Sequence, residues 1–238
     1  RVAVNAVDAA RHDFAQRGWQ TFRGSNLRPA LPAAHAAGLI RLFEMTPGQC
    51  AHSKLEALIS IFRDLPEGDI VEIGTLFGRS ALAFAFLANR YRTGKVLCVD
   101  PWSSAELHQD TEEVDAHSAK VPIQSVFEAF TANLSPWPGI VNYIRKPSTA
   151  AAALYASGAS IVSPEFGTTE YSLGISLLHI DGNHAVDAVR ADLGAWGGFL
   201  RTDGWIVFDD YLWAFGHGQR QVADEFYRGE VGVHIARG

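Results

Sequence analysis

The sequence predicts an α/β fold, in which a Rossmann-like parallel sheet carries helices on both faces and is preceded by an N-terminal helical segment. Beyond residue 69, short apolar runs alternate with longer stretches whose apolar residues recur every three or four positions. That alternation is typical of βαβ units, in which a helix connects each strand to the next. The apolar runs are nearly continuous, as expected for strands that are buried on both sides.

Five apolar runs are predicted to be strands, at 70–73, 96–99, 140–144, 175–180 and 205–208. Helical spacing lies between them, at 80–91, 123–134, 149–155 and 185–199. In the last of these, one face carries Val186, Val189, Leu193 and Trp196. A helix at 219–227 and a short strand at 231–235 follow, whereas residues 158–173 match no pattern that we can assign.

The first part of the chain shows helical spacing and no strand pattern. Apolar stripes run through 2–14, 35–43 and 54–62. We therefore divide the chain into an N-terminal helical cap, residues 1–66, and a sheet domain, residues 67–238. The cap is expected to lie over the sheet or to form part of a homo-oligomer contact. The polar segment 103–121 is expected to be a solvated loop or a lid over the site.

Composition restricts the partners of the protein. The 238 residues carry a formal net charge of −6, so no basic field is available to bind nucleic acid. No apolar stretch reaches the roughly 18 residues of a membrane span. The two cysteines do not suggest a disulfide framework, and a reducing cytoplasm is the expected location.

Glycine and an acidic residue follow the first two predicted strands. Gly74 and Gly78 stand in a Gly-x-x-x-Gly spacing, which differs from the Gly-x-Gly-x-x-Gly of a dinucleotide site. Asp100 ends the second strand, where a carboxylate can accept hydrogen bonds from ribose hydroxyls. The glycines have an alternative explanation, because a tight turn can require glycine for steric reasons alone. Asp100 could instead cap a helix, and so could Ser148, which follows the third predicted strand.

Three carboxylates come directly after the last two predicted strands. Asp181 follows one strand, and Asp209 and Asp210 follow the next. Each one alone fits a turn residue, but the carboxyl ends of parallel strands meet at one edge of a sheet, where ligands bind. Grouped carboxylates repel one another unless a cation neutralises them, and a hard, oxygen-seeking ion such as Mg²⁺ suits them.

Two histidines compete for the role of general base. His184 stands three residues after Asp181, at the start of the next helix. His217 lies on the loop after Asp210. A histidine at a helix start is often structural, but beside a metal and a substrate a proton-accepting role becomes competitive.

Four motifs, taken together, resemble a known family. They are EIGTLFGRS at 72–80, DPW at 100–102, IDGNH at 180–184 and FDDY at 208–211. This ordered set is similar to class I S-adenosylmethionine-dependent O-methyltransferases, and most similar to the small metal-dependent type that acts on catechols and macrolide sugars. The resemblance spans roughly residues 66–228. It implies a sheet of the seven-stranded type, usually closed by a terminal β-hairpin, of which only 231–235 is apparent here.

The resemblance also implies roles for individual residues. Glu72, Gly74 and Ser80 would line the methionine part of the cofactor. Asp100 would bind the ribose and Ser148 would lie near the adenine, and we also place Trp102 and Asp181 among the cofactor-binding residues. The metal, Mg²⁺ or Mn²⁺, would be bound by Asp181, Asp209 and Asp210. The base would be His184, with Asp181 beside it.

The expected activity is metal-dependent transfer of a methyl group from S-adenosylmethionine to a hydroxyl of a small molecule, such as a sugar or natural-product acceptor. Four aromatic residues follow or lie near the predicted site loops: Trp102, Tyr211, Trp213 and Phe215. They could form an apolar wall for the acceptor, or they could be ordinary packing residues. Two alternatives remain open, a Rossmann-type NAD(P)-dependent oxidoreductase and a non-catalytic cofactor-binding module. The missing dinucleotide spacing counts against the first, and the set of carboxylates with His184 counts against the second.

Overall fold

The computed structural model describes residues 28–104, 112, 115–116, 120–158 and 160–229. Within them, five parallel strands form a central sheet in the order β3-β2-β1-β6-β7. The strands are β1 (Asp69–Ile73), β2 (Val96–Val99), β3 (Val141–Ile144), β6 (Ile175–Ile180) and β7 (Leu200–Phe208). All residues of β1, β2 and β6 are buried, as their continuous apolar runs predict.

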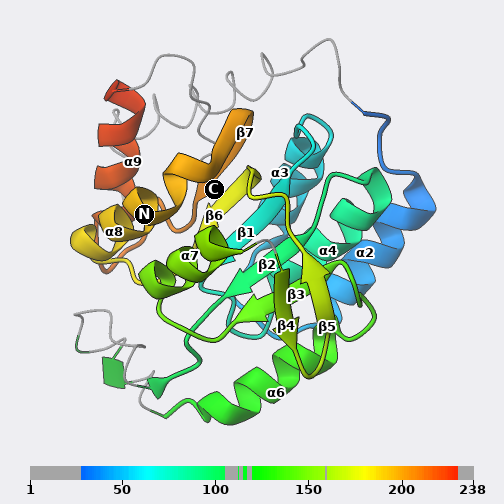
Figure 1. Ribbon diagram of the computed structural model, residues 1–238, viewed down its shortest axis with the longest axis horizontal. Helices are drawn as coiled ribbons and strands as arrows, with labels where there is room; N and C mark the ends of the chain where they lie inside the picture. Colours follow the sequence, from blue (N-terminus) through cyan, green and yellow to red (C-terminus); the bar gives the residue numbers. More distant parts are fainter. Residues whose placement is uncertain (1–27, 105–111, 113–114, 117–119, 159, 230–238) are drawn as a thin grey trace, which may run out of the picture.

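Helices cover both faces of the sheet (Figure 1). One apolar cluster joins a sheet face to α2 (Ala33–Met45), α3 (His52–Phe62), α4 (Arg79–Tyr91) and α6 (Ile123–Leu134). A second cluster joins the opposite face to α7 (Ser148–Ser157), α8 (Val186–Trp196) and α9 (Gly218–Gly229). Successive strand residues point to opposite faces, so Ile70 belongs to the first cluster and Val71 to the second.

The strand order reverses between β1 and β6. From β1 the chain adds β2 and then β3 on one side, and it later returns to place β6 and β7 on the other side. The loops after β1 and β6 therefore diverge and open a crevice at the carboxyl edge of the sheet. Gly74 lines this crevice with a φ of 82°, and a Cβ added there would lie 2.1 Å from the carbonyl oxygen of Asp181. Only glycine fits at that position.

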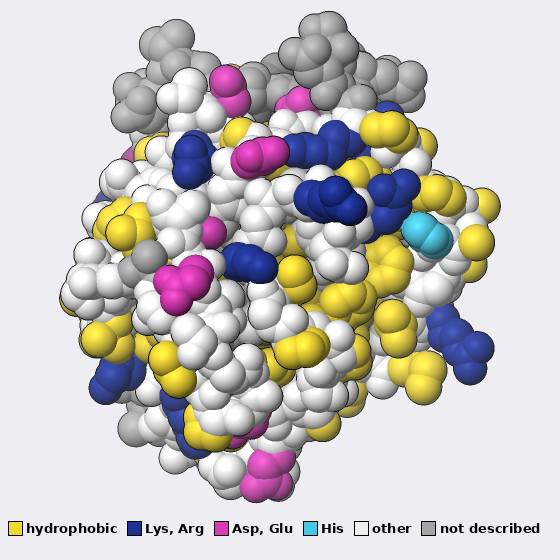
Figure 2. All heavy atoms as spheres, turned by 45° about the vertical axis from the view of Figure 1, so that its right-hand side comes forward, with side chains coloured by type: hydrophobic (Ala, Val, Ile, Leu, Met, Phe, Trp, Pro, Cys, Tyr) yellow, Lys and Arg dark blue, Asp and Glu magenta, His cyan; other side chains and the backbone are white. Residues whose placement is uncertain are grey.

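The cap helices belong to the same cluster as one sheet face. Phe62 of α3 stacks on Phe84 of α4 with ring centroids 6.0 Å apart. On the outer side of α2, Ile40, Leu42 and Met45 stay 39%, 41% and 71% exposed. Figure 2 shows hydrophobic side chains over the part of the surface on which α2 lies. This exposed apolar character agrees with an oligomer contact through the cap, which stays a prediction.

Most predicted elements are confirmed, and the largest difference lies at β7. The runs 96–99 and 175–180 are strands, and 123–134 is a helix, with those bounds. β7 begins at Leu200 instead of 205, because the polar residues 201–204 form a register shift opposite Ile175 and hide the strand pattern. The end of the predicted helix 185–199 is a separate 3₁₀ turn, η2 (Gly197–Phe199).

The unassigned segment 158–173 contains an antiparallel hairpin of β4 (Ser160–Ser163) and β5 (Gly167–Glu170). The side-chain amide of Asn142 in β3 donates hydrogen bonds to the carbonyl oxygens of Ile161 and Gly167, at 3.0 and 2.9 Å. The predicted helix at 2–14, the predicted strand at 231–235 and most of the segment 103–121 lie outside the described residues. Among the described helices, none has the length and apolar character needed to cross a bilayer.

Candidate active site

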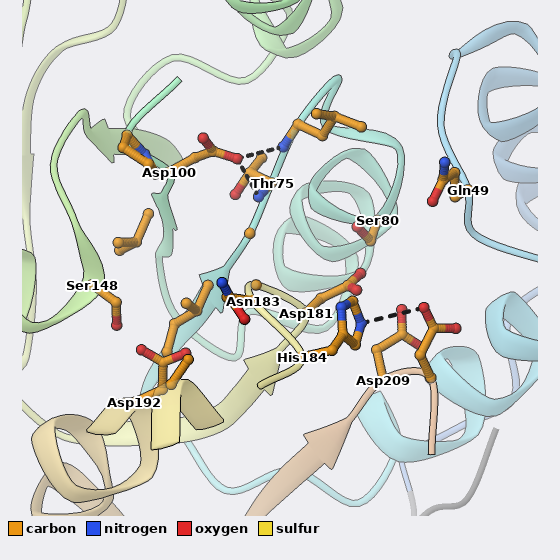
Figure 3. A pocket seen from close by; sticks show the side chains of 18 of the residues that line it. Gln49, Thr75, Ser80, Asp100, Ser148, Asp181, Asn183, His184, Asp192 and Asp209 are labelled. Carbon is orange, nitrogen blue, oxygen red and sulfur yellow. Dashed lines mark hydrogen bonds and ion pairs between the residues drawn. The ribbon is translucent and has the colours of Figure 1, made fainter. Parts of the chain in front are cut away.

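A cavity of about 1090 Å³ lies at the carboxyl edge of the sheet, over the crevice between β1 and β6. Its size is sufficient for a nucleoside cofactor together with a second small molecule. The loop after β1 contributes Gly74, and the start of α4 contributes Ser80. Five of the remaining sequence-predicted residues on its wall are labelled in Figure 3, namely Asp100, Ser148, Asp181, His184 and Asp209. Asp210 also lines the cavity.

Asp100 organises the loop that follows β1. Its Oδ2 accepts hydrogen bonds from the backbone N–H groups of Thr75 and Leu76, at 3.0 and 2.9 Å. Its Oδ1 accepts one from the backbone N–H of Trp102 at 2.7 Å. Burial raises the pKa of this carboxyl above its usual value, although these three donors oppose the shift. The carboxylate thus shapes the glycine loop and also faces the cavity.

Trp102 and Glu72, which the sequence analysis placed among the cofactor-binding residues, are buried and are not among the residues that line the cavity. Trp102 has a φ of 40°, and this backbone turns the indole inward until it is 1% exposed. Its indole N–H donates to the Leu76 carbonyl oxygen at 2.9 Å, so Trp102 supports the loop from behind. Tyr211 is likewise buried, and its hydroxyl donates to Asp224 Oδ1 at 2.6 Å.

Glu72 is fully buried and does not line the cavity, whereas the next residue, Ile73, does. It points to the same sheet face as Ile70, because the two are separated by one residue in β1. Its Oε1 lies 3.1 Å from Nδ1 of His179 in β6, while its Oε2 has no hydrogen-bond partner among the described residues. Burial lowers the pKa of His179, so the imidazole is held neutral.

Lys54 of α3 enters the group of carboxylates, and the sequence analysis did not predict this. Its Nζ donates hydrogen bonds to Oδ2 of Asp209 and, at 3.4 Å, to Oδ2 of Asp181. Burial alone would lower the pKa of Lys54, but the two carboxylates outweigh it and raise that pKa. The lysine is therefore a permanent cation at this end of the cavity.

One lysine does not neutralise the carboxylates around it. Burial favours protonation of Asp209, but Lys54 outweighs that effect and keeps the pKa of Asp209 below its usual range. At Asp181 burial prevails, and the pKa stays well above its usual value. Lys54 therefore compensates Asp209 but not Asp181, whose charge needs either a proton or a further cation. The chemistry of this donor set fits an additional hard cation.

His184 lies beside the carboxylates. Its Nε2 lies 3.3 Å from Oδ2 of Asp210, and its ring stacks on Trp213 with centroids 4.5 Å apart. Donor atoms of Asp181, His184 and Asp210 lie within 4.8 Å of one another. Donor atoms of Asp181 and Asp209 also lie within 4.8 Å of each other and of His179, so Asp181 belongs to both groups, while Asp209 in addition contacts Lys54. His217 is not among the residues that line the cavity.

The opposite end of the cavity carries another buried acid. Asp192 of α8 lies beside Ser148 at the start of α7 (Figure 3). The Ser148 hydroxyl accepts a hydrogen bond from the Trp196 indole N–H at 2.9 Å. Burial raises the pKa of Asp192 to about 6, and a hydrogen bond with Ser148 opposes the shift.

A sequence signal exists for both residues that the sequence analysis missed. Lys54 precedes Leu58 and Ile61 at helical spacing, so it lies on the buried face of its helix. Asp192 stands between Val189 and Trp196 at the same kind of spacing. A charged residue within an apolar stripe is rarely buried without a partner, and it marks a site to inspect.

Comparisons with known proteins agree with this geometry. Residues 71–211 match the family model described as "Methyltransferase domain". The chain is similar to the O-methyltransferase NovP, with 15% identity, a TM-score of 0.53, and coverage of 82% of this chain and 90% of that chain.

Two further solved structures have lower TM-scores. CalS11, a calicheamicin methyltransferase, has 17% identity and a TM-score of 0.47, with coverage of 76% and 79%. The SAH-bound methyltransferase PaMTH1 of Podospora anserina has 15% identity and a TM-score of 0.45, with coverage of 96% and 88%. A search of curated proteins gives no significant match.

Proposed function

Since the chain belongs to the family of methyltransferase domains, which take their methyl group from S-adenosylmethionine, we propose that it methylates a hydroxyl oxygen of a small molecule. One observation carries this proposal. A nucleoside-sized cavity ends in a histidine and three carboxylates, at the edge of the sheet where the glycine loop lies. Such a group is suited to deprotonate a hydroxyl and has no evident use in binding the cofactor alone.

The cofactor would extend along the cavity from Ser148 to Asp181. Gly74 lets the backbone approach the methionine part, and Ser80 offers a hydroxyl at the start of α4. Asp100 has a carboxylate facing the same space and can accept hydrogen bonds from the ribose hydroxyls. Glu72 contributes from below, by holding His179 under the site.

We assign the metal to oxygen ligands. Mg²⁺ and Mn²⁺ prefer carboxylate oxygen to imidazole nitrogen, so Asp181, Asp209 and Asp210 would bind the ion and His184 would remain free of it. Lys54 would still donate its hydrogen bond to one oxygen of Asp209. When bound, the ion would favour the alkoxide form of an acceptor hydroxyl.

The residues of the chain would then act by positioning and proton transfer. S-adenosylmethionine supplies a methyl group on a positively charged sulfur. As the oxygen–carbon bond forms and the carbon–sulfur bond breaks, the hydroxyl proton would pass to the imidazole of His184. Trp213 stacks on that imidazole and restrains its ring, while Asp210 lies 3.3 Å from its Nε2. Alignment of the reacting atoms in a cavity that excludes water would supply most of the rate.

The acceptor would lie against an aromatic wall. Trp213 and Phe215 line the cavity beside His184, with ring centroids 5.5 Å apart, and Phe215 is 50% exposed. Aromatic faces pack against sugar rings and against planar rings, which supports a sugar or another ring-bearing natural product as the acceptor.

Calorimetry tests the cofactor assignment. S-adenosylhomocysteine should bind the protein, whereas NAD⁺ should not. Asp100→Asn should weaken binding by about 1.5–3 kcal/mol, since a charged acceptor for the ribose is lost. Asp187→Asn is the matched control, because that carboxylate is on the outside of α8 with a side chain 99% exposed. Binding of NAD⁺ without binding of S-adenosylhomocysteine would overturn the proposal.

A further inference from the structure

Asp192 is a buried carboxylate with no cationic partner in the part of the chain that the structure describes. It is 6% exposed and lines the cavity from α8. Among the described residues, no lysine, arginine or histidine forms an ion pair with it, and only burial and the Ser148 hydroxyl shift its pKa. An acid in this position is costly to the fold unless donors from a ligand reach it.

Ser148 satisfies only part of what Asp192 can accept. The Ser148 oxygen already accepts the Trp196 indole N–H, so its single proton is available for Asp192. An ionised carboxylate has about four acceptor positions. The remaining ones face a ligand or water, since Asp192 lines the cavity.

The surroundings of Asp192 suit a flat, apolar-faced ring. Pro147, Ala188 and Ala191 line the same part of the cavity with small side chains. Oδ2 of Asp192 lies 3.7 Å from the position of a Cβ added at Gly182, so a larger side chain at 182 would narrow the slot. In Figure 3, Ser148 and Asp192 lie at one end, and Asp181, His184 and Asp209 lie at the other.

The residues at the two ends of the cavity define which way a nucleoside cofactor lies when its ribose is bound at Asp100. If its sulfur-bearing arm extends to Asp181, its base occupies the end with Ser148 and Asp192. Adenine carries at its 6 position an amino group with two N–H donors. Hypoxanthine and guanine carry a carbonyl oxygen there, which would place an acceptor against the acceptors of Asp192.

We propose that Asp192 accepts a hydrogen bond from the 6-amino group of the cofactor's adenine and thereby makes the site selective for adenine. This inference rests on the proposed function, and it goes beyond it by naming the residue that reads the base. Ser148, which the sequence analysis placed near the adenine, acts as a positioning residue that orients the carboxylate of Asp192.

The test compares two ligands by calorimetry. S-adenosylhomocysteine carries the 6-amino group, and S-inosylhomocysteine carries a carbonyl oxygen in its place. The wild-type protein should bind the first more tightly by a factor on the order of 100, because the second leaves buried acceptors without donors.

Asp192→Asn should reduce that ratio to less than about 10-fold, because an amide can present either its oxygen or its N–H group. Asp187→Asn, on the exposed side of the same helix, should keep the wild-type ratio. The Asn side chain has the shape of Asp, and circular dichroism and thermal unfolding confirm that each variant is folded.

An unchanged ratio in folded Asp192→Asn would overturn the assignment of Asp192, and so would equal binding of both ligands by the wild type. Both of those outcomes leave the cofactor proposal intact, since S-adenosylhomocysteine binds in each. A wild-type protein that binds neither ligand would overturn the inference together with the cofactor proposal.

Discussion

The two ends of the cavity treat buried acids in opposite ways. At one end, Asp181 and Asp209 have a partner within the chain, because Lys54 reaches them from the cap. At the other end, Asp192 has the Ser148 hydroxyl and, within the described ranges of the chain, no cation. The first arrangement stabilises a reactive group before any ligand arrives. In the second arrangement, Asp192 needs hydrogen-bond donors that a ligand supplies. The same carboxylate therefore makes ligand binding selective and destabilises the ligand-free fold.

Among the changes that test this comparison, removal of the metal should have the largest effect on activity. Dialysis against EDTA should abolish methyl transfer, and Mg²⁺ or Mn²⁺ should restore it, because Lys54 alone leaves the carboxylates short of positive charge. Binding of S-adenosylhomocysteine should survive, as its site lies mostly at the other end. Radiolabelled methyl transfer measures the activity, and a full rate in metal-free enzyme would show that Lys54 suffices.

His184→Ala should lower kcat by about 10²–10⁴-fold, which is the usual contribution of a positioned base. Affinity for S-adenosylhomocysteine should barely change. His217→Ala is the control, since that residue does not line the cavity. If His217→Ala is inactive and His184→Ala is near wild type, the base has been assigned to the wrong residue.

Lys54→Met should reduce the free energy of unfolding by about 3 kcal/mol near neutral pH, because it leaves Asp181 and Asp209 buried without a cation. Urea unfolding measures the change. Lys146→Met, at an exposed lysine, should have little effect. Added Mg²⁺ should stabilise Lys54→Met more than wild type, and equal stabilisation of both would show that metal and lysine do not share these carboxylates.

Asp192→Asn should stabilise the ligand-free protein, and more so at higher pH. The pKa of Asp192 rises from 3.8 to about 6 on folding, so ionisation favours the unfolded chain. This destabilisation begins above pH 3.8, grows as the pH rises, and is complete above pH 6. The gain in unfolding free energy should therefore be about 1 kcal/mol larger at pH 8 than at pH 5. An equal gain at both pH values would contradict a buried charge at this position.

The sequence was sufficient to predict the sheet and the carboxylates at the carboxyl edge of the sheet. Continuous apolar runs identify buried parallel strands, and residues after their carboxyl ends must meet, which is why Asp181, Asp209 and Asp210 lie together. Glu72 is buried on the sheet face of Ile70, and period-two alternation, followed residue by residue along the strand, predicts that placement. The inward turn of Trp102 depends on a left-handed backbone that residue types do not reveal.

Lys54 and Asp192 show a different limit. Both are charged positions within apolar stripes, and pattern recognition assigned the stripes to the core. Which partner a buried charge meets depends on tertiary contacts. Lys54 and Asp209 are 155 residues apart, and no local rule predicts that pair.

That separation also orders events during synthesis. At roughly 5–20 residues per second, Asp209 is added about 8–30 s after Lys54. Until β6 and Asp181 have been translated, β1 lacks one of its two neighbours and Lys54 of α3 has neither of its two acids, and until β7 has been translated, β6 is left as the edge strand. A nascent chain stalled before β7 therefore exposes an apolar sheet edge that chaperones recognise. Truncation before Leu200 should give a protein that aggregates, even though it retains the glycine loop and Asp100.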